Sequence, residues 1–174
     1  MGSGQQRKGK LMKLFKKAVL VDIDGTLVTL TPFDYGVFVK KDDETEEEKE
    51  MRVIEYLKFW DADTMNAEAL VGGVELLKKF KEEGYALVFL TARGQGCRKY
   101  TVKKLKEIGV WEMVDSMWHR PARWEGVSSS VYKEAMIKML MKKWDFEWAM
   151  DDEDKNLIVM EKMGMKVVDA KAWW

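Results

Sequence analysis

The sequence predicts an α/β fold, a Rossmann-like, doubly wound parallel sheet with helices on both faces. Four short, nearly unbroken apolar runs have the pattern of strands that are covered on both faces. The runs alternate with amphipathic segments of helical length, and this alternation is typical of parallel βαβ units. The predicted strands span residues 18–23, 86–90, 147–150 and 166–168.

Four segments with helical periodicity accompany these strands. Gly84, Gly109 and Gly164 are expected to end three of them, and the serines at 128–130 to cap the start of the remaining one. The side chains expected on the helix faces that pack against the sheet are Leu70, Val74, Leu77 and Phe80, then Thr101, Leu105 and Ile108, then Ala135, Met136, Met139 and Leu140.

One segment interrupts the alternation. We predict a small insertion over about 27–65, made of a hairpin over 28–39 and a helix over 51–60 that follows an acidic run. The apolar stripe of that helix is expected to be Val53, Ile54, Leu57 and Trp60. The remainder is expected to form one domain over 18–174, preceded by a flexible basic arm over 1–17.

Composition narrows the classes of function. The 174 residues carry 30 basic and 30 acidic side chains, so we do not expect the chain to hold long duplex nucleic acid by charge alone. The single cysteine, Cys97, excludes an internal disulfide and suits a reducing compartment. No apolar signal segment and no run of ~18 apolar residues occurs. We therefore expect a cytoplasmic protein without membrane contact.

Acidic and polar residues stand where the predicted strands end. In open α/β sheets ligands bind beyond the carboxyl ends of the strands, so these side chains are expected to converge on one site. The residues are Asp22 and Asp24 after the first strand, Thr91 after the second, Asp151 and Asp152 after the third, and Lys133 at the start of the helix before that third strand.

This set of side chains predicts phosphoryl transfer. Neighbouring carboxylates repel one another unless a cation lies between them, and hard oxygen ligands suit Mg²⁺. A cation and the ammonium of Lys133 would withdraw negative charge, so that Asp22 can approach a phosphorus atom. Asp24 is placed to protonate the leaving oxygen and later to deprotonate the attacking water.

In order and in strand context, Asp22-Ile-Asp24-Gly-Thr26, Thr91, Lys133 and Asp151-Asp152 resemble the four motifs of the haloacid dehalogenase (HAD) superfamily. The resemblance covers residues 18–168 and implies the HAD fold with a small cap insertion after the first strand. Because Asp24 is present, the resemblance favours the phosphatases of the superfamily over the dehalogenases.

The resemblance also implies a role for each motif residue. Asp22 matches the nucleophile that becomes an aspartyl phosphate, and Asp24 matches the general acid/base. Thr91 matches the hydroxyl that holds the transferring group, and Lys133 the ammonium that steadies Asp22 and the phosphate. The implied Mg²⁺ ligands are Asp22, the backbone carbonyl of Asp24, Asp151 and, through water, Asp152.

Five further residues are expected to contact a phosphorylated substrate: Gly25, Thr26, Ala92, Arg93 and Arg120. Each of the two arginines can bind a phosphate through two parallel hydrogen bonds. Each can equally be a solvated or salt-bridged surface group, so the sequence leaves both readings open.

A narrower likeness is to the 3′-phosphatase domain of phage polynucleotide kinase/phosphatase. It rests on residues 31–35, 91–94, 119–121 and 131–134 ahead of 150–152, and it implies removal of 3′-phosphates from DNA or RNA ends. The insertion over 42–60 is longer than that domain leads us to expect, and Thr-Ala-Arg replaces Ser-Gly-Arg. Because no Gly-x-x-x-x-Gly-Lys-Ser/Thr motif occurs, the kinase half of such an enzyme is absent, and any kinase or ligase that works with the chain is expected to be a separate partner.

Two other functions stay open at this point. A nucleotide or small-metabolite phosphatase would use the same residues, with the acidic insertion closing over the site as a lid. A non-catalytic, metal-binding module similar to receiver domains would also combine acids and a lysine on such a sheet. That module needs neither the proton shuttle of Asp24 nor the hydroxyl of Thr91, so both residues favour an enzyme.

Overall fold

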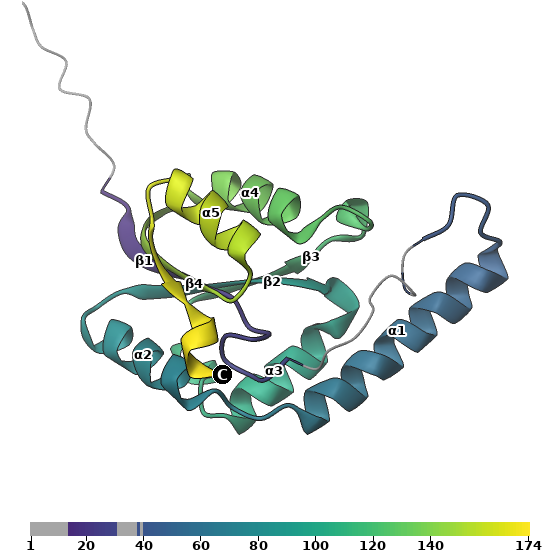
Figure 1. The fold of residues 1–174 in the computed structure, drawn as a ribbon, viewed down its shortest axis with the longest axis horizontal. Helices are drawn as coiled ribbons and strands as arrows, with labels where there is room; N and C mark the ends of the chain where they lie inside the picture. The colour runs from purple at the N-terminus through teal and green to yellow at the C-terminus, as the bar shows by residue number, and fades with distance from the viewer. Residues whose placement is uncertain (1–13, 31–37, 39) are drawn as a thin grey trace, which may run out of the picture.

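The structure is a computed structural model that describes residues 14–30, 38 and 40–174. Within these residues lies a parallel sheet with the strand order β3-β2-β1-β4-β5 (Figure 1). The doubly wound parallel sheet expected from the sequence is confirmed. Its strands are β1 (Lys16–Val21), β2 (Ala86–Gly94), β3 (Ser116–Arg120), β4 (Trp144–Asp151) and β5 (Lys166–Asp169).

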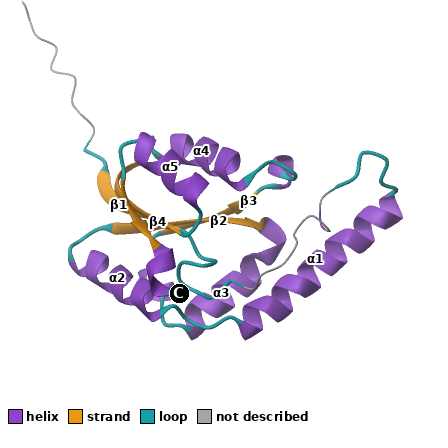
Figure 2. Ribbon diagram, in the orientation of Figure 1, coloured by secondary structure: helices purple, strands orange, loops and turns teal. Residues whose placement is uncertain are grey.

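Helices cover both faces of this sheet. In Figure 2, α4 and α5 lie on one face and α2 and α3 on the other, while α1 runs beside α3 and extends past the sheet. The described helices show no segment that is both long and apolar enough to span a bilayer. The helices are α1 (Glu46–Asn66), α2 (Val71–Glu82), α3 (Arg98–Glu107), α4 (Ser129–Leu140) and α5 (Asp154–Lys162).

Alternation along β1 divides the core into two clusters. Ala18 and Leu20 pack with the residues of α4 and α5, whereas Val19 and Val21 pack with those of α2 and α3. All four are almost completely buried, as expected for a central parallel strand. The predicted glycine stops are also present, since Gly84, Gly109 and Gly164 all have positive φ.

Three expectations about the elements were wrong. The sequence analysis missed β3, whose pattern Ser-Met-Trp-His-Arg lacks an apolar run because it is an edge strand with Trp118 38% exposed. Met139 is also 38% exposed, and Ile137 takes its place in the core. In α1, Val53 and Ile54 are exposed, because this helix extends beyond the sheet.

The other predictions for the first part of the chain have mixed outcomes. The predicted arm over 1–17 and hairpin over 28–39 lie largely outside the described residues. β1 begins two residues earlier than predicted, at Lys16. α1 is longer than predicted, and Thr45 and Glu48 form a capping box at its start.

The close approach of α2 to the turn after β1 depends on a glycine. A Cβ at Gly73 would collide with the backbone oxygen of Thr26. We predict that Gly73→Ala lowers the free energy of unfolding by about 1–3 kcal/mol in urea denaturation, despite the better helix propensity of alanine. The exposed Lys79→Ala is the control, and an equal or higher stability of Gly73→Ala would contradict the packing argument.

Candidate active site

The carboxyl ends of the central strands bring the predicted acids together. Asp22 directly follows β1, and its N–H donates to the carbonyl of Met150 in β4 at 3.0 Å. Asp151 is the last residue of β4, so the two carboxylates emerge from adjacent strands. Lys133, in the first half of α4, reaches the same point from above the sheet.

Lys133 forms two buried ion pairs. Its Nζ lies 2.9 Å from Asp22 Oδ1 and 2.6 Å from Asp151 Oδ2, and all three side chains are at most 8% exposed. Burial alone would lower the pKa of Lys133, but the charges of Asp22 and Asp151 outweigh it and raise that pKa above its ordinary value. The lysine is therefore a permanent cation between the two acids.

The turn after β1 orients Asp22 from the other side. Thr26 Oγ1 donates to Asp22 Oδ2 at 3.1 Å, and Thr26 itself is fully buried. Gly25, with φ +73°, allows the chain to turn between these two residues. A Cβ on Gly25 would also collide with the carboxylate of Asp152, so only glycine fits there.

The single ammonium of Lys133 does not neutralise all of the carboxylates around it. Asp22, Asp151 and Asp152 each offer a carboxylate oxygen, and these oxygens lie within 4.8 Å of one another. Burial and then the charge of Asp151 raise the pKa of Asp22 well above its ordinary value. Burial, above all, also raises the pKa of Asp152, to about 6. The group therefore holds more negative charge than the surrounding protein compensates.

These residues fit a hard divalent cation. Their donors are all oxygens, the ligand type that Mg²⁺ prefers. Asn156 adds a second observation, because its Oδ1 is a buried acceptor without a partner among the described residues. A hydrated cation beside it would supply the missing donors. Asp24 contributes no side-chain oxygen to the group of three.

Asn156 is a site residue that the sequence analysis missed. Its Nδ2 donates to Asp151 Oδ1 and Oδ2 at 3.2 and 3.3 Å, from the first turn of α5. A buried asparagine therefore orients the carboxylate that also pairs with Lys133. Its position five residues after Asp151, within the following helix, is the only signal that the sequence carries.

Arg93 is bound to Asp24 rather than exposed to solvent. Its Nε and Nη2 donate to the two oxygens of Asp24 at 2.8 and 2.5 Å. Its Nη1 donates to Thr64 in α1 and Thr101 in α3, and its guanidinium lies 4.4 Å from the ring centroid of Trp60. The arginine side chain is 1% exposed. Its expected contact with substrate stays a prediction, and the geometry favours a role in positioning Asp24.

Thr91, a predicted site residue, and His119 are both buried. Thr91 is 1% exposed, and its hydroxyl accepts the N–H of Arg93 at 3.1 Å. Its contact with the transferring group remains a prediction. His119 is buried too, with Nε2 at 3.0 Å from Thr101 Oγ1, and burial lowers its pKa to about 4. A neutral, buried histidine bonded to Thr101 favours a structural role for this side chain.

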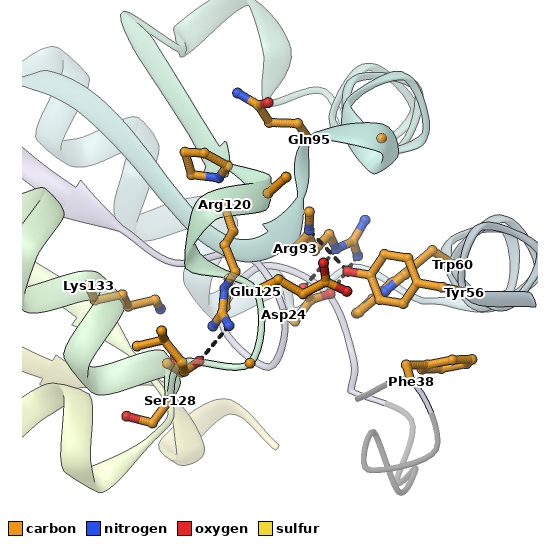
Figure 3. Close-up of a pocket in the computed structure, with 18 of the residues that line it drawn as sticks. Asp24, Phe38, Tyr56, Trp60, Arg93, Gln95, Arg120, Glu125, Ser128 and Lys133 are labelled. Carbon is orange, nitrogen blue, oxygen red and sulfur yellow. Dashed lines mark hydrogen bonds and ion pairs between the residues drawn. The ribbon is translucent and has the colours of Figure 1, made fainter. Parts of the chain in front are cut away.

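A cavity of about 740 Å³ lies in front of these groups. Figure 3 shows Arg120 between Lys133 on one side and the Asp24–Arg93 pair on the other. Arg120 Nη1 donates to the carbonyl of Val127 at 2.6 Å, whereas its Nε is buried without a partner among the described residues. The predicted residues that line the cavity are Asp22, Asp24, Ala92, Arg93, Arg120, Lys133 and Asp152, whereas Gly25, Thr26, Thr91 and Asp151 do not line it.

The wall opposite Lys133 is aromatic. Phe38, Tyr56 and Trp60 line it, and Tyr56 contacts both of the other rings edge-on, with centroids 5.3 and 6.2 Å apart. The hydroxyl of Tyr56 also accepts the N–H of Gly94 at 3.0 Å, which ties α1 to the end of β2. The sequence analysis identified Trp60 only as part of a helical stripe and did not predict this wall.

Comparison with known proteins identifies the family. The sequence model of the HAD superfamily, subfamily IIIB (acid phosphatase), matches residues 6–168. The chain belongs to this family. The HAD resemblance is thereby confirmed, and the chain is a HAD-type phosphomonoesterase. No curated protein sequence matches it significantly.

Solved structures show the same fold at low sequence identity. A chain of the Pnkp1/Rnl/Hen1 complex superposes with a TM-score of 0.62 and 18% identity over 90% of this HAD phosphatase. The match spans only 46% of that longer chain, less than half of its length. A class C acid phosphatase from Bacillus anthracis with bound tungstate gives 0.56 and 17%, over 91% of this chain and 67% of its own. A haloacid dehalogenase-like hydrolase from Streptococcus pneumoniae gives 0.57 and 13%, over 88% and 84%.

Kinetics of Arg93 variants separate positioning from substrate binding. We predict that Arg93→Met lowers kcat by roughly 10- to 100-fold and leaves KM nearly unchanged, because Asp24, the expected acid/base, loses its orientation. Arg93→Lys should restore little, since one ammonium cannot bond both oxygens of Asp24. Steady-state assays with p-nitrophenyl phosphate measure both constants. A rise in KM at constant kcat would instead support the substrate contact expected from the sequence.

The raised pKa of Asp152 predicts a pH effect on the metal-free protein. The folded state holds this proton up to about pH 6, whereas the ordinary value is 3.8. The contribution of Asp152 to stability is therefore greatest below its unfolded pKa and is lost as pH rises toward 6. We expect Asp152→Asn to gain stability relative to wild type over this window, in urea denaturation with EDTA. A difference that is constant with pH would contradict the shift.

Proposed function

We propose that the chain is a Mg²⁺-dependent phosphomonoesterase that transfers the phosphoryl group to Asp22 and acts on 3′-phosphate ends of DNA or RNA. The observation that most supports this proposal is the fixed orientation of the Asp22 carboxylate. One oxygen pairs with Lys133 and the other accepts from Thr26, while the carboxylate faces the cavity. A carboxylate fixed in this way has little freedom to lose before it attacks phosphorus.

The proposed reaction has two steps. Asp22 Oδ attacks phosphorus and forms an aspartyl phosphate, while Asp24 gives a proton to the leaving oxygen. Asp24 then takes a proton from water, which attacks the same phosphorus and releases inorganic phosphate and free Asp22. The ammonium of Lys133 opposes the charge that develops on the phosphoryl oxygens.

Asp22, Asp151, Asp152 and the backbone carbonyl of Asp24 would hold the Mg²⁺. When bound, the cation offsets negative charge on the acids and on the phosphate. The protein's own part is to keep the three carboxylates within reach of one ion, and Lys133 and Asn156 do this for Asp151. This accounts for the burial of an otherwise repulsive group.

The cavity supports a nucleoside as the leaving group. Its volume of about 740 Å³ exceeds what a phosphate needs, and its aromatic wall suits a flat base. Arg120 lies centrally and carries a buried N–H without a partner among the described residues, which suits a phosphate oxygen. The likeness in fold to a chain of the Pnkp1/Rnl/Hen1 RNA repair complex agrees with an end-processing role. A kinase or ligase activity would then come from elsewhere.

A nucleotide phosphatase is the second candidate. The ion pair between Arg52 in α1 and Glu125 joins two sides of the same cavity, as a lid over a small substrate would. An oligonucleotide end can enter only beside the Arg52–Glu125 ion pair or after this pair has separated. A mononucleotide can be enclosed behind the pair.

Phosphate release from three substrates decides between the two. We predict that a 3′-phosphorylated oligonucleotide is hydrolysed faster than its 5′-phosphorylated counterpart and than a 3′-mononucleotide, in Mg²⁺ but not in EDTA. Asp22→Asn should remove activity on all three. A preference for the mononucleotide would favour the second candidate. Stable phosphorylation of Asp22 without turnover would point to a receiver-like module.

A further inference from the structure

The segment after β5 reaches back to both loops that carry the site carboxylates. It comprises a short 3₁₀ turn, η5 (Ala170–Trp173), and Trp174, and in Figure 1 it ends beside the loop that follows β1. Trp174 Nε1 donates to the carbonyl of Gly25 at 2.8 Å. Lys171 Nζ donates to the carbonyl of Asp152 at 3.0 Å. One segment thus bonds the backbone of two separate site loops.

Lys171 acts on Asp151 through a single peptide unit. In a trans peptide the C=O and N–H point in opposite directions and move as one plane. The unit between Asp152 and Glu153 accepts from Lys171 at one end and donates its N–H to Asp151 Oδ1 at 2.9 Å from the other. The ammonium is held in turn by Asp154 at 2.7 Å. Lys171 therefore orients the carboxylate that also pairs with Lys133.

Trp174 acts on the turn after β1 in a similar way. The unit between Gly25 and Thr26 accepts from Trp174, and its N–H donates to the carbonyl of Ile23 at 3.2 Å. This unit lies between Asp24 and the hydroxyl that bonds Asp22. Rotation of the unit would move both side chains, so the indole N–H restrains them together.

Packing anchors the segment itself. Ala170 is fully buried, and Trp173 lies against the core cluster of β1, β2, α2 and α3. The Trp173 ring occupies the place that a Cβ on Gly72 would need, so α2 has no side chain there. The two hydrogen bonds to the site loops therefore start from a fixed base.

We propose that Lys171 and Trp174 are positioning residues. They hold the turn after β1 and the Asp151–Asp152 loop at the distance from each other at which carboxylates of both can bind one cation. The inference rests on the proposed function insofar as that function supplies the cation. Neither side chain lines the cavity, so substrate affinity should not depend on them. Their loss should weaken Mg²⁺ binding and slow turnover together.

The test uses variants that remove only the hydrogen-bonding group. Lys171→Met keeps the aliphatic stem, and Trp174→Phe keeps an aromatic ring. We expect kcat for p-nitrophenyl phosphate to fall roughly tenfold and KM to stay within about twofold. The Mg²⁺ concentration that is needed for a given rise in Tm should increase by roughly tenfold as well.

Two matched controls come from the same chain. Lys78→Met breaks a surface ion pair with Glu75, and Trp118→Phe removes an indole bond to Ser116 at 2.8 Å. Both should behave as wild type. Lys171 and Trp174 variants with wild-type kcat and Mg²⁺ response, or with a lower metal-free Tm as their only change, would overturn the inference. A wild-type protein that turns over without any response to Mg²⁺ would overturn the proposed metal and the inference with it.

Discussion

The ammonium of Lys133, buried between Asp22 and Asp151, is the contact on which the site depends. A buried charge is costly unless it is paired and hydrogen-bonded, and breaking such a pair costs far more than a surface pair. The three partners come from α4 and from the ends of β1 and β4, so correct packing of these elements is required before the charges can meet. Together with Asp152, three carboxylates surround the one positive charge of Lys133. The arrangement that orients Asp22 therefore also favours binding of a divalent cation.

A second set of contacts joins Asp24 to α1. Arg93 bonds Asp24 with two N–H groups and meets Trp60 and Thr64 of α1. The helix that supplies Tyr56 and Trp60 to the aromatic wall therefore also restrains the Asp24 carboxylate. A displacement of α1 would therefore move the Arg93 guanidinium and, with it, the Asp24 carboxylate.

The sequence predicted the parallel sheet and the convergence of Asp22, Lys133 and Asp151, because apolar runs and strand-end acids are local signals. It could not predict what Arg93 bonds, since Asp24 lies 69 residues away and only the folded chain makes them neighbours. The edge strand β3 was not predicted, because its sequence lacks an apolar run. The role of Asn156, the aromatic wall and the contacts of Trp174 depend on tertiary packing of α5, α1 and η5. The sequence therefore carries no local signal that predicts them.

The central claim is that Asp22 itself accepts the phosphoryl group. Rapid acid quench during turnover, followed by borohydride reduction, converts an aspartyl phosphate to homoserine, which peptide mass spectrometry can locate. We predict homoserine at position 22 when substrate is present and its absence when substrate is omitted. Turnover with no modification at position 22, or with phosphate on another residue, would contradict the account.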